Sequence, residues 1–221
     1  MDRVGKKTLE IMSQAVWYNT WLFGQIKKYV KGDILEVGAG IGNFTPFLKT
    51  CGKVIAIDYD PVYKNTNFGD IEKGKYFFKH PPAGGFDTIV CMNVLEHIKD
   101  DKRALTNMSN LLKNKGKLIL LVPAHQWAYG LMDKNLGHIR RYNKNQLSNI
   151  LKANSYSLIA IRYLNWLGLI GWFVNGRIFR KKIIPTGQLG IFDKLARPFL
   201  LLEETFEPSF GLSVLVIGEK K

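Results

Sequence analysis

A short apolar run that leads directly into spaced glycines constrains the fold of this chain more than any other feature. Residues 34–37 (ILEV) predict a buried strand, and Gly38, Gly40 and Gly42 follow it. Residues 43–50 (NFTPFLKT) then predict a helix. Glycines after a strand let the backbone come close to a ligand, and a helix that begins there leaves N–H groups free. The segment therefore indicates a ligand-binding edge of a sheet.

Strand and helix signals alternate along the following residues. Near-continuous apolar runs at 53–60, 85–94 and 117–124 predict strands, and helical spacing over 103–113 predicts a helix before the last of them. Strands that are apolar throughout and separated by helices are typical of a parallel sheet buried on both faces. We therefore expect an α/β fold with helices on both faces of the sheet.

The charge balance is strongly basic. Counts of 32 Lys and Arg against 18 Asp and Glu give a net charge of +14, which favours polyanions or an anionic membrane surface as partners. Cys51 and Cys91 are too few for a disulfide framework and have no CxxC spacing, which indicates a reducing compartment such as the cytoplasm. No signal-peptide pattern is visible, and the longest uncharged apolar stretch, 163–176, is shorter than the roughly 18 residues that span a bilayer.

Two carboxylates make the glycine loop a nucleotide-type site. Asp58 ends the second predicted strand, where a carboxylate can accept hydrogen bonds from both hydroxyls of a ribose. This pattern also fits a nicotinamide-dependent dehydrogenase. The GxGxG spacing, however, differs from the GxGxxG turn that binds a pyrophosphate, and Glu36 would repel a pyrophosphate but suits a ligand with an ammonium group.

Five motifs follow one another between residues 34 and 122: ILEVGAGIGNF, VIAIDYDP, FGDIE, FDTIVCMNVLEHIKDD and LLKNKGKLILLVP. Together they resemble the class I S-adenosylmethionine-dependent methyltransferases. Beyond them, AYGLMDKNLGHIRRYNKNQL and FGLSVLVIGEK resemble a subgroup of small bacterial and archaeal methyltransferases. The resemblance implies a Rossmann-like, seven-stranded, mostly parallel sheet whose last strand, 213–219, is antiparallel.

The resemblance also implies S-adenosyl-L-methionine as the cofactor. Its methionine part, ribose and adenine would lie at the ends of the first, second and third strands, and the end of the fourth would close over it. The implied cofactor-binding residues are Glu36, Gly38, Gly40 and Asn43, then Asp58 and Tyr59, then Asp70 and Ile71, and finally Asn93, Val94 and Leu95, with Glu96 and His97 behind them. Only about a dozen residues separate the second group from the third, so the usual second helix is expected to be shortened.

We expect a single methyltransferase domain with four parts. These are an N-terminal helix at 8–30, a cofactor-binding core at 31–125, an acceptor-side loop at 126–145 and a helical lid insertion at 166–208. The insertion lies between two predicted strands, 156–165 and 210–220, and is too long for a simple connection.

Methyl transfer from a sulfonium is an in-line displacement that needs alignment and, for some acceptors, removal of a proton. His125, after the fifth strand, and His138 are therefore candidate bases, because histidine accepts protons near neutral pH. Arg141 and its neighbour Arg140 could clamp a phosphate or carboxylate, and Tyr142 completes the candidate catalytic set. The alternatives are that His125 only caps a loop and that the arginines only begin a helix. No zinc-ligand spacing occurs, so no metal site is expected.

The predicted lid combines apolar and basic residues. Trp166, Trp172 and Phe173 precede a basic cluster formed by Arg177, Arg180, Lys181 and Lys182. This pattern suits a small-molecule or lipid-linked acceptor that the enzyme meets at an anionic membrane surface. In one variant of the hypothesis the acceptor itself is anionic. The alternative is that the aromatic residues simply pack the insertion onto the core.

The leading hypothesis is thus an O-methyltransferase acting on a small or lipid-linked acceptor, cytoplasmic or membrane-peripheral. An RNA methyltransferase is a second hypothesis, because Lys and Arg neutralise phosphates. No RNA-binding appendage and no Asn-Pro-Pro-Tyr-type motif accompany the charge, so nucleic acid is the less favoured acceptor. A cofactor-binding interaction subunit without activity is the third. The oligomeric state is left open.

Overall fold

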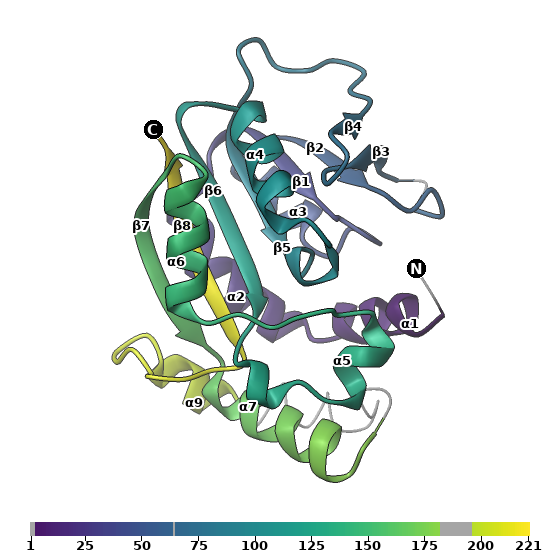
Figure 1. Cartoon of the computed structure of the whole chain (residues 1–221), viewed down its shortest axis with the longest axis vertical. Coiled ribbons are helices and arrows are strands. Elements are labelled where there is room, and N and C mark those ends of the chain that lie inside the picture. Colours follow the sequence, from purple (N-terminus) through teal and green to yellow (C-terminus); the bar gives the residue numbers. More distant parts are fainter. Residues whose placement is uncertain (1–2, 64, 182–195) are drawn as a thin grey trace.

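The computed structural model describes residues 3–63, 65–181 and 196–221. These residues form one eight-stranded sheet with the order β4-β3-β2-β1-β5-β6-β8-β7 (Figure 1). The strands are β1 (Gly32–Val37), β2 (Gly52–Asp58), β3 (Asn67–Asp70), β4 (Lys75–Tyr76), β5 (Phe86–Met92), β6 (Leu112–Pro123), β7 (Tyr156–Leu164) and β8 (Ser213–Lys220). The neighbours from β3 through β6 are parallel, which confirms the α/β prediction.

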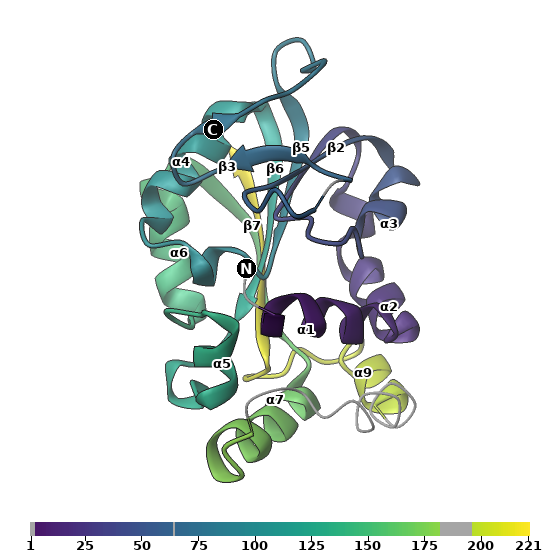
Figure 2. The ribbon, with the colours of Figure 1, turned by 90° about the vertical axis from the view of Figure 1, so that its right-hand side faces the viewer.

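Helices cover both faces of the sheet (Figure 2). The longer helices are α1 (Arg3–Ser13), α2 (Val16–Ile26), α4 (Asp101–Leu111), α6 (Lys144–Ala153) and α7 (Trp166–Phe173), and the shorter ones are α3 (Thr45–Lys49), α5 (Leu131–Leu136) and α9 (Arg197–Leu202). Single turns occur at η1 (Lys27–Tyr29), η2 (Leu95–His97), η3 (Gln126–Ala128) and the π-helical η4 (Val174–Ile178). Asp100 caps α4 by accepting a hydrogen bond from the N–H of Arg103.

The central strand contributes to two apolar layers. Leu35 packs into the layer that α4 and α6 cover, whereas its neighbour Ile34 packs into the layer that α2 and α9 cover. Both side chains are fully buried, because successive residues of a strand point to opposite faces. Cys91 is also fully buried in the first layer.

The prediction of one N-terminal helix over 8–30 is wrong, because the helix is interrupted between α1 and α2. The N–H of Ala15 donates to the Met12 carbonyl over 3.1 Å, a tight turn that ends α1. The buried Asn19 side chain donates to the same carbonyl over 2.9 Å. Asn19 thus satisfies the end of one helix from inside the next, which apolar spacing does not reveal.

The sheet has one strand more than the seven expected. The two-residue β4 pairs antiparallel with β3 at the edge. Between β2 and β3 the described residues, 59–63 and 65–66, form turns instead of a helix. The contraction predicted from the spacing of Asp58 and Asp70 is therefore complete in those residues.

The C-terminal strand has the predicted direction. β8 lies between β6 and β7 and is antiparallel to both, with Val216 opposite Leu120 on one side and Ile161 on the other. Strand β8 therefore lies inside the sheet, between β6 and β7, and β7 forms the edge.

The described part of the predicted lid, 166–181 and 196–208, contains α7, η4 and α9 beyond the carboxyl ends of β6 and β7 (Figure 1). Residues 182–195, including Lys182 of the basic cluster, lie outside the described residues. The aromatic residues make contacts within the protein: Trp166 meets Phe199 at 5.9 Å between ring centroids, and Phe173 meets Trp127 at 5.5 Å. No helix among the described residues is long and apolar enough to cross a membrane.

Candidate active site

The loop after β1 requires glycine at successive turns. Gly38, Gly40 and Gly42 have φ angles of 71°, 55° and 85°, in the left-handed region that disfavours side chains. A Cβ on Gly38 would lie 2.3 Å from a methyl carbon of Val94, and one on Gly40 would lie 2.8 Å from a methyl carbon of Leu9. The loop is therefore a close-fitting cradle between the end of β5 and the first helix.

Asp58 fastens this cradle to the end of β2. Its carboxylate accepts the N–H of Gly40 over 2.9 Å and the N–H of Asp60 over 3.0 Å. Burial raises the pKa of Asp58 despite these two hydrogen bonds. The neighbouring Tyr59 is 56% exposed. Asp58 thus positions the glycine loop in this structure, and its contact with a ribose remains a prediction.

Glu36 places a buried carboxylate under the loop. It is 5% exposed and accepts a hydrogen bond from the Thr45 hydroxyl over 2.5 Å. Burial raises its pKa to about 7, against the opposing effects of that hydrogen bond and of Lys49. A buried carboxylate with unused lone pairs beside a glycine cradle fits a cationic amino-acid group. These residues therefore suit the methionine part of the expected cofactor.

The segment after β5 approaches the cradle from the other side. Asn93 is exposed, has a φ of 54° and donates its N–H to the Leu121 carbonyl over 2.7 Å. Val94 packs against Gly38. Leu95 is fully buried in the apolar layer under α4, so its side chain supports the segment from behind.

The predicted adenine residues lie at the end of β3. Asp70 forms an ion pair with Lys73 at 3.2 Å and accepts the Lys73 N–H. Ile71 is 4% exposed, belongs to the core, and receives a hydrogen bond at its carbonyl from Asn107 over 2.8 Å. Both residues are thus fixed by other parts of the chain, and their contact with adenine stays a prediction.

Helix α1 covers the glycine loop. Asn43 donates to the Leu9 carbonyl over 3.0 Å, and the Leu9 side chain lies against Gly40. Figures 1 and 2 place α1 beside α5 at the carboxyl ends of the strands. In this structure Asn43 therefore holds the covering helix.

A buried polar cluster lies on the acceptor side, behind the segment after β5. His138 Nδ1 lies 2.9 Å from Asp133 Oδ1, and His138 Nε2 lies 3.8 Å from Glu96 Oε1. The ring of His97 meets the ring of His138 edge-on at 4.8 Å between centroids. Glu96 and Asp133 are fully buried, and the exposed fraction of the His138 side chain is 9%. Sequence reasoning named His138 but gave Glu96 no role and missed Asp133, five residues upstream.

The charges of this cluster differ between the two acids. Burial raises the pKa of Glu96 to about 7, against the opposing pull of His138 and of its own backbone N–H. Burial also acts to raise the pKa of Asp133, but the hydrogen bond from His138 and the Arg141 charge lower it to about 2. Burial lowers the pKa of His97 to about 4. Asp133 is thus ionised at neutral pH, and the His97 ring is neutral.

Arg141 supports the cluster from inside the protein. Its Nε donates to Asp133 over 2.8 Å, and its Nη1 donates to the Ala124 carbonyl over 2.9 Å. The guanidinium lies 5.1 Å from the centroid of the Trp172 ring, whose Nε1 also donates to Asp133. Because Arg141 is 3% exposed, it orients Asp133 and α7 in this structure and has little surface with which to clamp an acceptor.

Tyr142 and Arg140 fix the loop to α4. The Tyr142 hydroxyl lies 3.0 Å from Asp101 Oδ2, and burial raises its pKa far above the ordinary value. Arg140 donates to the same carboxylate oxygen over 2.8 Å. The structure therefore gives Tyr142 a supporting contact, and its catalytic role stays a prediction.

His125, the second candidate base, lies in a different environment. It has a φ of 62° and stacks on Tyr163 with 4.7 Å between ring centroids. Burial lowers its pKa, and the Arg141 charge adds to that effect. His125 thus lies against aromatic rings and has no acid beside it among its described contacts.

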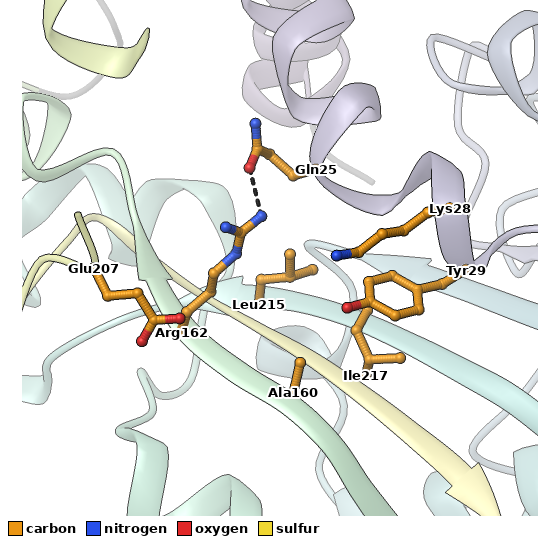
Figure 3. A pocket seen from close by; sticks show the side chains of 8 residues that line it. All are labelled: Gln25, Lys28, Tyr29, Ala160, Arg162, Glu207, Leu215 and Ile217. Atoms are coloured by element: carbon orange, nitrogen blue, oxygen red, sulfur yellow. Dashed lines mark hydrogen bonds between the residues drawn. The ribbon is translucent and has the colours of Figure 1, made fainter. Parts of the chain in front are cut away.

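A further pocket lies between η1 and strands β7 and β8 (Figure 3). Arg162 donates to Gln25 across it, and Glu207, Lys28 and Tyr29 line its sides. None of the lining residues belongs to the candidate cofactor site. The pocket is therefore separate from the glycine cradle and from the His138 cluster.

Comparison with known proteins assigns the family. A family described as "methyltransferase domain" matches residues 22–161, which is more than half of the chain. An uncharacterized methyltransferase of Staphylococcus carnosus is 30% identical over 107 residues, which cover 45% of this chain and 51% of that protein. The mitochondrial ubiquinone biosynthesis O-methyltransferase of Schizosaccharomyces pombe is 24% identical over 184 residues, covering 72% of this chain and 67% of that protein. The chain thus spans about half the length of the first relative and two thirds of the second.

Solved structures agree with this fold. A SAM-dependent methyltransferase of Thermotoga maritima superposes over the full length of both chains with a TM-score of 0.63 at 15% identity. One from Archaeoglobus fulgidus covers 91% of this chain and 94% of its own, with a TM-score of 0.59 at 12% identity. The glycine cradle, the buried Glu36 carboxylate and the sheet order fit S-adenosylmethionine as the cofactor. The chain therefore belongs to the methyltransferase domain family.

Proposed function

We propose that this enzyme transfers the methyl group to a hydroxyl oxygen of a small-molecule or lipid-linked acceptor. The observation that carries the proposal is the pairing of His138 with Asp133 directly behind the segment 93–95. Hydroxyl oxygens become good nucleophiles only as they lose their proton, so an O-methyltransferase benefits from a proton-accepting group near the cofactor. The relative from Schizosaccharomyces pombe is itself named as an O-methyltransferase.

The chemistry assigned to the cluster is removal of one proton. The acceptor hydroxyl loses its proton to the His138 cluster, and its oxygen forms a bond to the methyl carbon. The bond between that carbon and the sulfur breaks, and its electron pair stays on sulfur, which leaves S-adenosylhomocysteine. Asp133 orients the imidazole, because its carboxylate oxygen lies 2.9 Å from Nδ1 and leaves Nε2 as the nitrogen that can accept the proton.

The acceptor class is proposed from the surface of the lid. Ile170, Ile178, Phe179 and Phe199 are 41–63% exposed. Arg177 and Arg180 are exposed among them. Apolar side chains interspersed with basic ones favour an anionic membrane surface, and the proposal therefore includes a cytoplasmic enzyme that meets its acceptor there.

The test is transfer of a labelled methyl group from S-adenosylmethionine into lipid extracts, small-molecule extracts and RNA. The proposal expects label in a lipid or small-molecule fraction, with the new methyl group on oxygen. His138→Asn is expected to lower turnover at least 100-fold while cofactor binding is retained. His80→Asn, on an exposed loop, is the matched control and should leave turnover unchanged.

Other outcomes would overturn the proposal. Label found only in RNA would make the enzyme an RNA methyltransferase, to which its net charge of +14 is suited. Cofactor binding without transfer to any fraction would favour an interaction subunit. Full turnover of His138→Asn would remove the role assigned to the cluster.

A further inference from the structure

We infer that Glu96, His97 and His138 form a binding site for one divalent transition-metal ion, with Zn²⁺ as the best match. One ligand atom from each residue can be chosen so that all three lie within 4.8 Å of one another. The inference deepens the proposed function and rests on it only for the role of the ion, because binding itself can be measured without an acceptor.

Glu96 is the first observation that calls for a cation. Its side chain is fully buried, and neither carboxylate oxygen has a hydrogen-bond partner among the described residues. The nearest basic atom is His138 Nε2, 3.8 Å from Oε1, which is beyond hydrogen-bond range. Buried carboxylates in proteins are almost always hydrogen-bonded, paired or bound to a metal ion. Glu96 lacks a hydrogen-bond partner among the described residues, which leaves a close ion pair or a bound metal ion.

The orientation of His138 is the second observation. Its Nδ1 lies 2.9 Å from an oxygen of Asp133, which can only accept a hydrogen bond when ionised, so the proton is on Nδ1. The lone pair of Nε2 then faces Glu96. A nitrogen lone pair and a carboxylate oxygen that lie 3.8 Å apart in a buried site repel unless a proton or a cation lies between them. An imidazole whose other nitrogen donates to a carboxylate is the common arrangement of a metal-ligating histidine.

His97 supplies the third donor. Its Nδ1 lies 3.3 Å from the Gly137 carbonyl oxygen, which can only accept, so the proton is again on Nδ1. Nε2 of His97 is then free to bind a metal ion. Ligand atoms around a tetrahedral zinc ion with bonds of 2.0–2.1 Å are about 3.3 Å apart, so small side-chain movements would close the observed distances.

The donor set selects the kind of ion. Two imidazoles and one carboxylate form the three-ligand set of catalytic zinc sites, which leaves one position open. Imidazole nitrogens favour zinc and neighbouring transition metals over Mg²⁺ and Ca²⁺, which prefer oxygen. Asp133 would be the outer support of the ligand His138, and it is itself held by Arg141 at 2.8 Å and by the N–H of Gly130 at 2.9 Å.

Sequence spacing could not predict this site. Glu96 and His97 end the turn after β5, whereas His138 follows α5, and the sheet brings the two segments together. The N–H of Ile139 donates to the Glu96 carbonyl over 2.9 Å and fixes their relative position. In the proposed reaction the open position would take the acceptor hydroxyl and lower its pKa. With Nε2 of His138 bound to the ion, the proton of that hydroxyl would pass to water instead of to the imidazole, and His138 would act as a ligand of the ion instead of as the base.

The test is isothermal titration of Zn²⁺ into purified full-length protein that has been treated with a chelator. We expect one ion per chain, no binding of Mg²⁺ under the same conditions, and a rise in melting temperature with zinc. Visible absorption of Co²⁺ bound in place of zinc reports the coordination geometry. Glu96→Gln, which keeps the shape of the side chain, and His138→Asn should each weaken zinc binding at least 10-fold. His80→Asn should leave it unchanged.

The outcomes separate this inference from the proposed function. Zinc binding that Glu96→Gln and His138→Asn do not weaken, or no zinc binding by the folded protein, overturns the metal site. O-methyl transfer that persists in metal-free protein would retain the proposed function without the ion. Stoichiometric zinc binding at these residues with methyl transfer only to RNA or to no acceptor would retain the site and overturn the proposed function.

Discussion

Arg141 Nε lies 2.8 Å from Asp133 Oδ1, the oxygen that His138 Nδ1 approaches to 2.9 Å. Both partners of this ion pair are almost completely buried. The pair links the loop that carries His138 to the end of β6 and to α7, since Arg141 also binds the Ala124 carbonyl and Trp172 also binds Asp133. One internal carboxylate thus sets the position of the candidate catalytic histidine.

Asp133→Asn should be strongly destabilising. It leaves the Arg141 charge buried without its partner, which typically costs about 3–5 kcal/mol of unfolding free energy. Urea unfolding followed by circular dichroism measures the change. Asp70→Asn is the matched control, because its partner Lys73 is largely exposed, and it should cost less than about 1 kcal/mol. Equal losses of unfolding free energy in the two variants would show that the buried ion pair stabilises the protein no more than the exposed one.

Glu36 should make cofactor binding depend on pH. Its pKa of about 7 in the free protein lies above the ordinary 4.5, so near pH 6 most molecules carry a neutral side chain there. An ammonium group binds the ionised form, and affinity for S-adenosylhomocysteine should therefore rise between pH 5.5 and 7.5 and then level off. Titration calorimetry across this range gives the profile, and Glu36→Gln should bind weakly with a flat profile. A wild-type profile as flat as that of Glu36→Gln would contradict the contact.

The same shift has a consequence for stability in the absence of cofactor. Because the folded-state pKa is raised, the contribution of Glu36 is fully present below pH 4.5 and is lost as pH rises through 7. Glu36→Gln should therefore unfold at higher urea concentration than the wild type at pH 8, and the difference should shrink toward pH 5. No change of the difference with pH would mean that burial of Glu36 is incomplete in solution.

Gly38→Ala should abolish cofactor binding. The new methyl group would meet Val94 at 2.3 Å, and the φ of 71° is unfavourable for alanine, so the cradle must open. Gly84→Ala is the matched control, because its φ is 76° but nothing lies within 4 Å of the added carbon. The control should lose about 1 kcal/mol of stability and retain binding. Equal binding by the two variants would exclude close contact between the loop and the cofactor.

The parallel core and the glycine loop could be predicted because each depends on local pattern. Apolar strands such as 34–37 have few alternatives once glycines follow them. The interruption of the first helix at Ala15 could not be predicted, since it depends on a hydrogen bond from the Asn19 side chain to a carbonyl seven residues earlier in the sequence. Asp133 was missed for a related reason: an acid in a short polar helix looks solvated until the fold places Arg141 beside it. Long-range pairing of polar groups is the information that periodicity lacks.

Reversal of charge on the lid should reduce membrane binding if the acceptor is met at an anionic surface. Arg177 and Arg180 are exposed between apolar side chains, and each basic residue near such a surface contributes about 1 kcal/mol. The double variant Arg177→Glu and Arg180→Glu should therefore lower flotation with phosphatidylserine vesicles at least 10-fold, and added salt should likewise weaken vesicle binding by the wild type.

The matched control is Lys73→Glu with Lys75→Glu, on exposed residues near the opposite edge of the sheet, which makes the same change in net charge. Because net charge is equal in the two double variants, a loss confined to the lid would assign binding to its surface. Equal losses would assign it to overall charge, and no loss in either would remove the membrane from the proposal.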